Sequence, residues 1–533
     1  MREKEKVEMR FTEHQNHIKE ELTGRIKNNL SGFLSVCLVG LLVLFQIGII
    51  ILLPFVLRNF TVYFYFILEI FSIGLILSLV NDNRSPSYKI SWICIALALP
   101  ISGHIMYLIW GGQDSTKRLD DNIRQIMKHG ALFLEHNQTL EEEFYREKPK
   151  EVRLSKFMST NNFPLYANNE ITYYPMGEDA FEVIFKELEK AQKFILINFF
   201  IVAEGAIWDK LHEILVKKVK QGIEVKFMYD DFGAMIRTDK HFRRRLEQEG
   251  IEVQIFNPIH KYTDKLYMNY RSHQKIIVID GNVGFTGGFN IADEYANLIE
   301  RFGVWKDNGI RLEGDAVWGL TVTFFQMWEV CAGKVEVVYE RYRPTKEFPK
   351  NKVYCHVISD GPACNSENAI ENIYQQMIQY SEEYLYITTP YLIIEDDMKR
   401  ALVTAVQSGV DVRIITPYIP DKKNVKLLTD YNYGYLLKYG VRIFEYKPGF
   451  IHAKTILNEK SAIVGTINMD YRSFYLHYEN GVWISDKDTV FTIRQDVEAT
   501  LAQCEEIFYE DWLRRPLKKK LAQAILNIFS TLM

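Results

Sequence analysis

Cysteine is scarce in this chain of 533 residues, which contains only six. No two of them form a CxxC pair, so their spacing offers neither a disulfide scaffold nor a zinc site. The sequence also lacks HExxH, Walker A and GxGxxG motifs. These absences argue against a zinc protease, a P-loop nucleotide hydrolase and a dinucleotide-binding enzyme.

A basic excess is missing as well, because 64 Lys and Arg residues face 68 Asp and Glu residues and give a net charge of −4. A dedicated nucleic-acid binder usually carries a positive net charge, so we expect no nucleic-acid partner. Hydrophobic residues make up 47% of the chain and charged residues 25%, which excludes global disorder. A chain of this length is expected to contain about three or four structural units.

Apolar residues are concentrated near the N-terminus, directly after a charged segment at 1–32. Three long apolar runs follow, at 33–57, 62–80 and 90–110. A membrane-spanning helix needs about 20 apolar residues, and each run is close to that length. Buried core helices are the alternative, but three such runs in succession are hard to bury in a soluble protein. We therefore expect a transmembrane region at 33–112 and a multi-pass protein of the cell membrane.

The side of the membrane on which the rest of the chain lies stays open. Basic residues before the first run favour a cytoplasmic N-terminus, and three full spans would then leave the C-terminal part outside. Pro100 and Gly103 can break the third run into a re-entrant segment, which would leave that part inside. The basic residues that follow the third run favour the second arrangement.

Residues 113–165 are polar and are predicted to form a helical connector, after which short strands and helices alternate. We expect strands at 194–201, 223–228 and 251–256, and helices at 207–221 and 238–249. Gly222 and Gly250 follow the two helices as stop signals. This βαβαβ order predicts a mixed, mostly parallel sheet that is covered by helices.

The same order of elements returns in the second half of the chain. Strands are expected at 384–388, 410–416 and 441–446, and helices at 396–408 and 424–439. This duplication predicts an α/β fold with two similar lobes, at 166–345 and 346–512. The first lobe has an extra segment at 257–271, which is either a rim loop of an active site or an inert surface loop.

Both lobes contain an HxK motif that is followed by a glycine-containing turn and an asparagine. The matched positions are His273, Lys275, Gly287, Gly288 and Asn290 in the first lobe, and His452, Lys454, Gly465 and Asn468 in the second. A third HxK, at His17, has neither the turn nor the asparagine and serves as an internal control. The repeat of the whole set, rather than HxK alone, therefore marks the candidate site.

The chemistry of this set suits a phosphate. A histidine and a lysine two residues apart on a strand point to the same face. Glycines let backbone N–H groups approach an anion closely, and the asparagine amide can donate beside the lysine. Each lobe thus offers a nucleophile or base, a cation and an amide donor, and two lobes related by a pseudo-two-fold axis can aim both sets at one phosphorus.

These residues resemble the HxKxxxxD…G-G/S-x-N motifs of the phospholipase D superfamily with two HKD motifs, and most closely its bacterial cardiolipin synthases of the Gram-positive type. The stretches that show the similarity include YRSHQKIIVIDGNVGFTGGFNIADEY (270–295), GVWKDNGIRLEG (303–314) and GFIHAKTIL…VGTINMDYRSFYLHYENG (449–481). The resemblance implies two phospholipase D-like lobes preceded by an N-terminal α-helical transmembrane region.

The resemblance also implies a role for each motif residue. His273 would be the nucleophile and His452 the general acid and base. The residues that would hold the phosphate oxygens are Lys275, Lys454, Asn290, Asn468 and the glycines of the turns. The superfamily places an acid after each motif to orient a histidine, and Asp307 and Glu479 are the candidates.

The second motif departs from the family pattern at its aspartate. Asp280 fills this position in the first lobe, whereas counting from Lys454 leads to Glu459 and counting back from Gly465 leads to Asn458. Asp280 and Glu459 complete the two candidate catalytic motifs. Because the motif aspartate of the superfamily is usually structural, the departure bears on the stability of the hairpin more than on activity.

Residues 513–533 are predicted to form a basic amphipathic helix. Its apolar residues Leu521, Ile525, Ile528, Phe529 and Leu532 lie on one helical face, after a cluster of lysines and arginines. Such a helix suits an anionic lipid surface, and packing onto the catalytic lobes is the alternative.

We therefore expect a cardiolipin synthase that transfers a phosphatidyl group reversibly between two phosphatidylglycerol molecules. Phosphatidylglycerol and anionic membrane lipids are the expected partners, and the oligomeric state stays open. No cofactor and no metal is expected, because the motif lysines, asparagines and glycine amides can compensate the charge of the phosphate. A membrane-bound hydrolytic phospholipase D, in which water replaces the lipid alcohol, is the alternative function.

Overall fold

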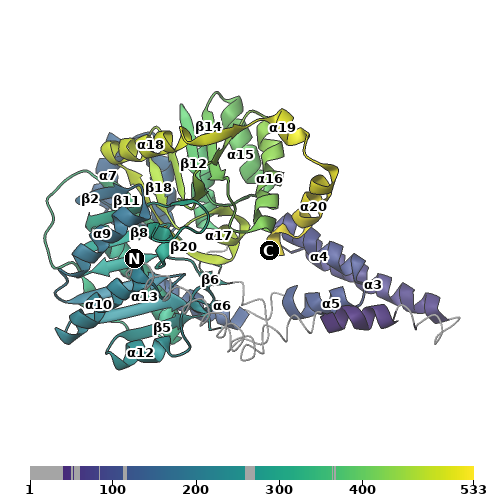
Figure 1. Ribbon diagram of the computed structural model, residues 1–533, viewed down its shortest axis with the longest axis horizontal. Helices are drawn as coiled ribbons and strands as arrows, with labels where there is room; N and C mark the ends of the chain where they lie inside the picture. The colour runs from purple at the N-terminus through teal and green to yellow at the C-terminus, as the bar shows by residue number, and fades with distance from the viewer. Residues whose placement is uncertain are drawn as a thin grey trace, which may run out of the picture. The chain divides into compact units, whose positions relative to one another are not determined.

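The computed structural model describes residues 40–49, 52, 60–82, 84–111, 117–258, 270–362, 364 and 368–532. The chain divides into two compact units, and the larger one is built from Lys117–Phe256 and Asn269–Met533 (Figure 1). The charged segment with His17, most of the first apolar run and most of the extra segment at 257–271 lie outside the described residues.

The N-terminal unit contains a helix at Gly40–Ile49, α3 (Thr61–Val80), α4 (Pro86–Ala98), α5 (Ser102–Met106) and a π-helical turn at Tyr107–Gly111. Within the described part of the chain, one helix, Val62–Val80, is long and apolar enough to cross a membrane. The sequence predicted three such spans, so the structure offers one candidate where a multi-pass arrangement was expected.

The third apolar run is not one helix, because it breaks between α4 and α5. Leu99 lies before a proline and adopts a non-helical conformation with φ −127° and ψ 72°. A Cβ atom on Gly103 would lie 2.6 Å from the carbonyl oxygen of Ile95, so α5 packs closely against the backbone of α4. The sequence offered a break at Pro100 as the alternative to a continuous third span, and the structure shows this break.

The predicted connector consists of α6 (Lys117–Ala131), α7 (Gln138–Glu147) and α8 (Val152–Thr160). Helix α6 packs on α13 (Val317–Ala332) of the first lobe, while Phe144 and Met158 of α7 and α8 are buried in the core of the second lobe. The chain then forms β1 (Leu165–Tyr166), which pairs with β11 (Tyr354–Asp360). The connector therefore contacts both lobes.

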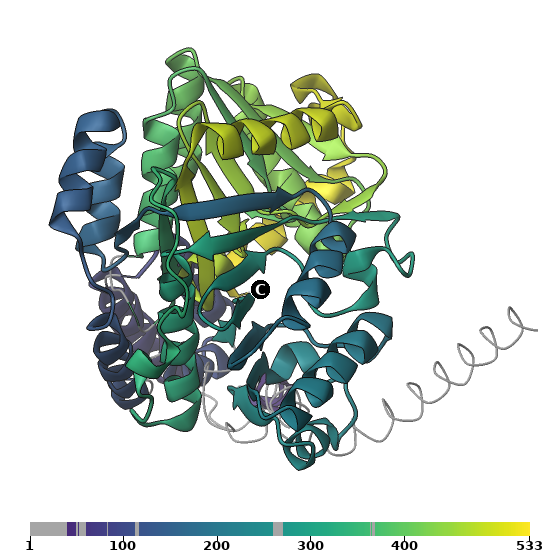
Figure 2. The same cartoon turned by 90° about the vertical axis from the view of Figure 1, so that its left-hand side faces the viewer.

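Two sheets with the same strand order form the catalytic lobes, which lie beside each other (Figures 1 and 2). The first runs β2 (Asn169–Tyr174), β10 (Gly309–Gly314), β8 (Val283–Gly287), β7 (Ile276–Ile279), β3 (Phe194–Phe199), β4 (Glu224–Asp230) and β5 (Glu252–Phe256). The second runs β11, β20 (His477–Ser485), β18 (Ala462–Gly465), β17 (Thr455–Asn458), β12 (Tyr384–Thr388), β14 (Asp411–Pro417) and β15 (Arg442–Tyr446), with β1 and β21 (Cys504–Ile507) at its edges. The predicted duplication into two α/β lobes is confirmed.

Along the two matched strand orders, the parallel pairs are those of β3–β4–β5 and β12–β14–β15, where the predicted helices form the crossovers. These helices are α10 (Ala206–Lys220), α12 (Phe242–Gln248), α15 (Asp396–Gln407) and α16 (Lys423–Lys438). The other pairs along these two strand orders are antiparallel, and short turns join β7 to β8 and β17 to β18. The sheets are mixed as predicted, but the expected parallel majority is wrong.

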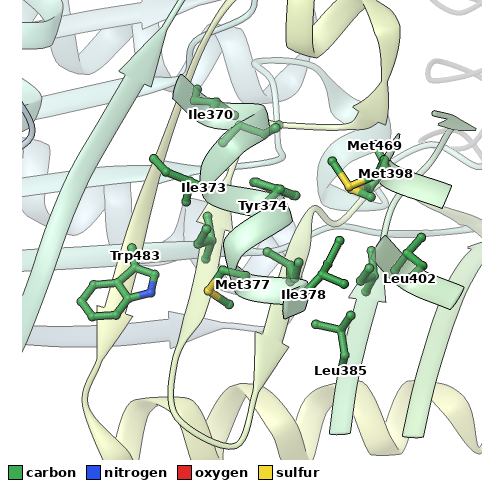
Figure 3. Close-up of a cluster of buried hydrophobic side chains, with 14 of the residues drawn as sticks. Ile370, Ile373, Tyr374, Met377, Ile378, Leu385, Met398, Leu402, Met469 and Trp483 are labelled. Carbon is green, nitrogen blue, oxygen red and sulfur yellow. The ribbon is translucent and has the colours of Figure 1, made fainter. Parts of the chain in front are cut away.

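The hydrophobic core of the second lobe also buries the short segment that directly follows Asn468 (Figure 3). Helix α14 (Ala369–Gln379) packs its buried Ile373, Tyr374 and Met377 against apolar residues of β12, α15 and β20. Met469, directly after Asn468, belongs to the same cluster and is 1% exposed. Burial of this neighbour holds the backbone of Asn468 in place.

Candidate active site

The two HxK motifs lie at equivalent places in the two sheets. His273 and Lys275 lie between β6 (Arg271–Ser272) and β7, and His452 and Lys454 lie between β16 (Gly449–Ile451) and β17. Both histidines are buried, with 6% of each residue exposed. They line one cavity of about 540 Å³, so the structure brings the two motifs together as predicted.

Each histidine is held by the backbone of the other lobe. Strand β6 pairs in parallel with the start of β20, and β16 pairs in parallel with β9 (Val304–Lys306). The backbone N–H of His273 donates to the carbonyl of Tyr478 at 2.9 Å, and that of His452 donates to Lys306 at 2.7 Å. These short ladders place the residues that follow Tyr478 and Lys306 beside the opposite histidine.

Those next residues are the predicted acids, Glu479 and Asp307, and both side chains are fully buried. The Nδ1 atom of His273 lies 2.9 Å from a carboxylate oxygen of Glu479, and Nδ1 of His452 lies 2.7 Å from Asp307. A carboxylate at Nδ1 holds the ring proton there and leaves the Nε2 lone pair available. Each histidine is therefore paired with the acid of the other lobe.

The motif lysines lie directly beneath the histidines. Lys275 Nζ donates to the carbonyl of His273 at 2.7 Å, and Lys454 Nζ donates to the carbonyl of His452. Burial lowers the pKa of Lys275 to about 7 and that of Lys454 to about 8, although the two buried carboxylates oppose this shift. Both lysines are thus poised to gain full charge when an anion enters.

Burial also lowers the pKa of both imidazoles well below 6.5, and the charges of Lys275 and Lys454 add to the effect. Burial raises the pKa of the Asp307 carboxyl to about 6, although Lys454 opposes this shift. Neutral imidazoles with free Nε2 atoms can act as a nucleophile and as a base near neutral pH. A phosphodiester anion would in turn favour protonation of whichever histidine donates to the leaving oxygen.

The predicted asparagines line the same cavity. The side-chain oxygen of Asn290 accepts from the backbone N–H of Ile201 at 3.0 Å, and its buried amide nitrogen has no hydrogen-bond partner in the described part of the chain. The buried side-chain oxygen of Asn468 is likewise without a partner there. Asn290 can therefore offer its amide N–H to an anion as it stands, and Asn468 can do so after rotation about χ2 exchanges its oxygen and nitrogen.

The glycines of the turns have a different use from the one predicted. The N–H of Gly288 donates to the carbonyl of Asn308 at 2.9 Å and is not offered to an anion. A Cβ atom on Gly288 would lie 2.0 Å from a carboxylate oxygen of Asp307. Cβ atoms on Gly287 and Gly465 would lie 2.4 Å from carbonyl oxygens of the neighbouring strands. These glycines therefore make room for the neighbouring strands and for the acid.

The carboxylates of Asp280 and Glu459 bind backbone N–H groups of a neighbouring segment, which gives them a structural place instead of the catalytic one expected from the sequence. The carboxylate of Asp280 accepts three backbone N–H groups, from Gln192, Lys193 and Phe194, at 2.7–2.9 Å. Glu459 accepts the equivalent pair before β12, from Glu382 and Glu383, at 3.1 and 3.3 Å. Both acids hold the start of the adjacent strand.

The shortened turn of the second motif explains why the sequence offered two candidates for the aspartate position. The side chain of Asn458 accepts from the backbone of Lys460 and Ser461 at 3.0 and 2.9 Å and closes the turn. The longer side chain of Glu459 then reaches the neighbouring strand. Glu459 therefore makes the contacts to the neighbouring strand that Asp280 makes in the first lobe, and Asn458 stabilises the turn.

Sequence reasoning missed the residues that surround the two imidazoles. Rings of Phe200 and His477 lie 5.1 and 5.5 Å from His273, and rings of Tyr295 and Trp305 lie 5.3 and 5.5 Å from His452. Trp305 and His477 each stand two residues before the acid of their lobe. The alternation of side chains along a strand could have placed them on the same face as Asp307 and Glu479.

One group of described residues, His273, His477 and Glu479, has donor atoms close enough to share a metal ion, within 4.8 Å of one another. Glu479, however, already accepts hydrogen bonds from His273 and from the hydroxyls of Thr466 and Ser473. A metal ion would have to displace these donors. The set fits hydrogen-bonded support of His273 better than metal coordination.

Comparison with known proteins places these features in a family. Residues 184–308 and 374–512 match the family model described as cardiolipin synthase, PLD-like domain, and 70–112 match that described as phospholipase D-nuclease N-terminal. A cardiolipin synthase from a Geobacillus species is 32% identical over 456 residues, which cover 85% of this chain and 90% of that protein. An uncharacterized protein from Streptococcus mutans is 36% identical over 464 residues, which cover 86% of this chain and all of that protein.

A solved structure shows the same fold. The crystal structure of phosphatidylserine synthase from Haemophilus influenzae superposes with a TM-score of 0.55 at 15% identity, over 71% of this chain and 98% of that one. At this identity the likeness concerns the fold alone.

Proposed function

Because the chain belongs to the family of cardiolipin synthases with phospholipase D-like domains, we propose that it converts two phosphatidylglycerol molecules into cardiolipin and glycerol. The observation that supports this most directly is the pair of buried histidines, each held by an acid of the other lobe, in one cavity. The enzyme is a phosphatidyltransferase of the phospholipase D superfamily.

In the first half-reaction, Nε2 of His273 attacks the phosphorus of the first phosphatidylglycerol. The bond between phosphorus and the glycerol oxygen breaks, and protonated His452 gives its proton to that oxygen. A phosphatidyl-histidine and free glycerol result. Glu479 keeps the Nδ1 proton of His273 in place, so the attacking lone pair faces the cavity.

In the second half-reaction, His452 removes a proton from a hydroxyl of the second phosphatidylglycerol. The oxygen attacks phosphorus and releases His273. One phosphodiester replaces another, so the reaction is close to thermoneutral and excess glycerol should reverse it. The buried Asp307 stabilises the imidazolium that His452 becomes.

The negative charge that grows on the phosphate oxygens needs compensation. Lys275 and Lys454 supply it through their charge, from buried positions where they donate to the carbonyls of the two histidines. The amides of Asn290 and Asn468, which line the cavity, can donate to the same oxygens. Such preorganised donors are effective because charges interact more strongly at a buried site than in bulk water. The mechanism therefore uses neither a metal nor another cofactor.

Membrane lipids are the proposed substrates and partners, and two exposed apolar features support this. Helix α3 exposes apolar residues along its length. Helix α20 (Leu517–Ile528) exposes Leu517, Leu521 and Ile525 to 80%, 61% and 49%. On its other side Lys519 donates to Asp430 of α16 at 2.7 Å and Gln523 is fully buried.

The sequence offered packing and lipid binding as alternatives for this helix. In the structure its polar side packs on the lobe, which leaves its apolar side free for lipid. We propose that this side contacts the membrane from which the enzyme takes its substrates.

One assay tests the proposed function against the hydrolytic alternative. Purified protein is incubated in phosphatidylglycerol vesicles with a chelator, and the products are separated by mass. Cardiolipin and glycerol are expected in equal amounts, and added glycerol should convert cardiolipin back. Phosphatidic acid as the main product would replace the synthase with a hydrolase, and a requirement for Mg²⁺ would contradict the metal-free mechanism.

A further inference from the structure

Two arginines in the wall of the catalytic cavity share a single carboxylate. Arg237 and Arg301 each donate from Nη1 to the same oxygen of Glu294, at 2.5 and 2.7 Å. The Glu294 side chain is 5% exposed, whereas those of Arg237 and Arg301 are 21% and 44% exposed. Both guanidiniums thus reach the open part of the cavity from a buried anchor.

This triad has a net positive charge. Within the described residues no other carboxylate lies within ion-pair distance of either guanidinium. Burial alone would raise the pKa of the Glu294 carboxyl, but the two guanidiniums outweigh it and hold that pKa below its usual value. Glu294 is therefore ionised and balances only one of the two positive charges.

Two other cations of the cavity each pair with one carboxylate. Arg271 pairs with the buried Asp230 at 3.2 Å. Lys422 pairs with Asp421 at 2.8 Å. Arg472 also lines the cavity and donates to Nε2 of His477 at 3.3 Å, on the His273 side. Arg237 and Arg301 differ from these cations because two guanidiniums share one carboxylate.

The triad lies on the side of the cavity where the acceptor alcohol must be activated. Glu294 directly precedes Tyr295, whose ring packs against His452 at 5.3 Å. Arg237 also acts on the Tyr295 hydroxyl, because its charge opposes the rise in the pKa of that hydroxyl that burial causes. An acceptor whose hydroxyl reaches His452 would place its next charged group near these arginines.

We propose that Arg237 and Arg301 bind the second phosphodiester of the reaction. This is the phosphate of the acceptor phosphatidylglycerol, and in the reverse direction the phosphate of cardiolipin that does not react. The inference rests on the proposed function. In phosphatidylglycerol the reacting hydroxyl and the phosphate are at opposite ends of one glycerol, so the phosphate must follow the hydroxyl into the cavity.

The pair would make the enzyme selective for a lipid acceptor. Water and free glycerol have no second phosphate and gain nothing from the two arginines. A phosphodiester acceptor gains charge-assisted hydrogen bonds to two guanidiniums. The same site chemistry would therefore give cardiolipin rather than a hydrolysed lipid.

Two reactions of one enzyme separate this role from general catalysis. Exchange of labelled glycerol into phosphatidylglycerol needs one phosphodiester, and cardiolipin formation needs two. Both are measured in the same vesicles with the full-length protein carrying Arg237→Gln, Arg301→Gln or both changes. Arg243→Gln is the matched control, because Arg243 is an exposed arginine of α12 that pairs with Glu247 at 2.7 Å.

The double variant should lower the ratio of cardiolipin formation to glycerol exchange about tenfold or more, because charge-assisted hydrogen bonds are lost. Each single variant should lower it less, and Arg243→Gln should leave it unchanged. The single variants keep one partner for Glu294, and Arg301→Lys, which keeps the charge, should restore part of the ratio.

Three results would count against the inference in different ways. If both reactions fall in parallel in the folded single variants, or neither falls, the arginines do not bind the acceptor. If Arg472→Gln lowers the ratio instead, the acceptor phosphate lies on the His273 side. If the wild-type enzyme exchanges glycerol but makes no cardiolipin, the proposed function itself fails.

Discussion

The two lobes repeat one strand order but surround their histidines differently. His452 is enclosed by the rings of Tyr295, Trp305 and Phe450 at 5.3–5.8 Å. His273 has Phe200 at 5.1 Å and a second imidazole, His477, at 5.5 Å. Trp305 and His477 occupy matching positions, so one substitution between the repeats makes one half of the cavity more polar. Duplication therefore preserved the geometry of the motif and changed its environment.

The two orienting acids also differ in their surroundings, and the acid beside His452 again has the fewer polar neighbours. Glu479 receives hydrogen bonds from two hydroxyls, those of Thr466 and Ser473, in addition to His273. Asp307 receives one backbone N–H, from Asn308 at 2.9 Å, in addition to His452. Burial raises the pKa of the Asp307 carboxyl to about 6, and such a basic carboxylate stabilises an imidazolium well. This difference supports His452 as the acid and base and His273 as the nucleophile.

The largest effects on this comparison are expected when each histidine is replaced. His273→Ala should abolish turnover and leave no covalent adduct, because the nucleophile is gone. His452→Ala should slow turnover by about 10²–10⁴-fold while a phosphatidyl adduct still forms on His273. Peptide mass spectrometry after acid-free quenching locates the adduct, and His17→Ala should behave like wild type. An adduct on His452 in the His273→Ala variant would reverse the two roles.

The pairing of acids across the lobes gives the next largest effect. Asp307→Asn and Glu479→Gln should each slow cardiolipin formation by about 10²-fold or more, because each leaves one histidine in the wrong tautomer. A phosphatidyl ester of p-nitrophenol needs no proton on its leaving group. It should restore adduct formation in Asp307→Asn but not in Glu479→Gln, as measured by nitrophenolate release. Rescue of Glu479→Gln instead would mean that the acids serve the histidines of their own lobes.

The pH dependence of kcat/KM tests the same site through the protonation of its residues, and the expected effect is smaller. As pH falls below about 6, Asp307 gains a proton and no longer accepts from His452, so the rate should fall. As pH rises through about 7 to 8, Lys275 and Lys454 lose their protons and bind phosphate less well, so the rate should fall again. Lys454→Arg should shift the alkaline limb upward, because a guanidinium stays charged. A flat profile across this range would contradict the assignment.

The smallest effects concern the motif acids that hold the strands. Asp280→Asn should lower the free energy of unfolding by roughly 2–3 kcal/mol, because its carboxylate accepts three backbone hydrogen bonds. Glu459→Gln should lower it by roughly 1 kcal/mol, because two longer bonds are involved. Activity per folded molecule should stay near wild type in both, as checked by thermal melting beside turnover. A normally melting Glu459→Gln protein with turnover as low as His452→Ala would return this residue to the catalytic set.

Much of the fold could be predicted because it is encoded by local patterns. Strand β12 begins and ends where the sequence predicted, at Tyr384 and Thr388. The ends of α10, α15 and α16 lie at most one residue from their predicted positions. Gly222 and Gly440 follow their helices with φ of 82° and 93°, a conformation that glycine adopts without strain. Periodicity and stop signals act within a few residues, so the sequence displays them directly.

The sequence by itself determined the two lobes, the two HxK sets and the residue types of the orienting acids. Only the tertiary structure decided which acid serves which histidine, because β6 pairs with β20 and β16 with β9 across roughly two hundred or one hundred and fifty residues. It also decided that Gly288 makes room for Asp307 and that α20 packs through its polar side. These outcomes depend on contacts between distant segments, for which no local pattern names the partner.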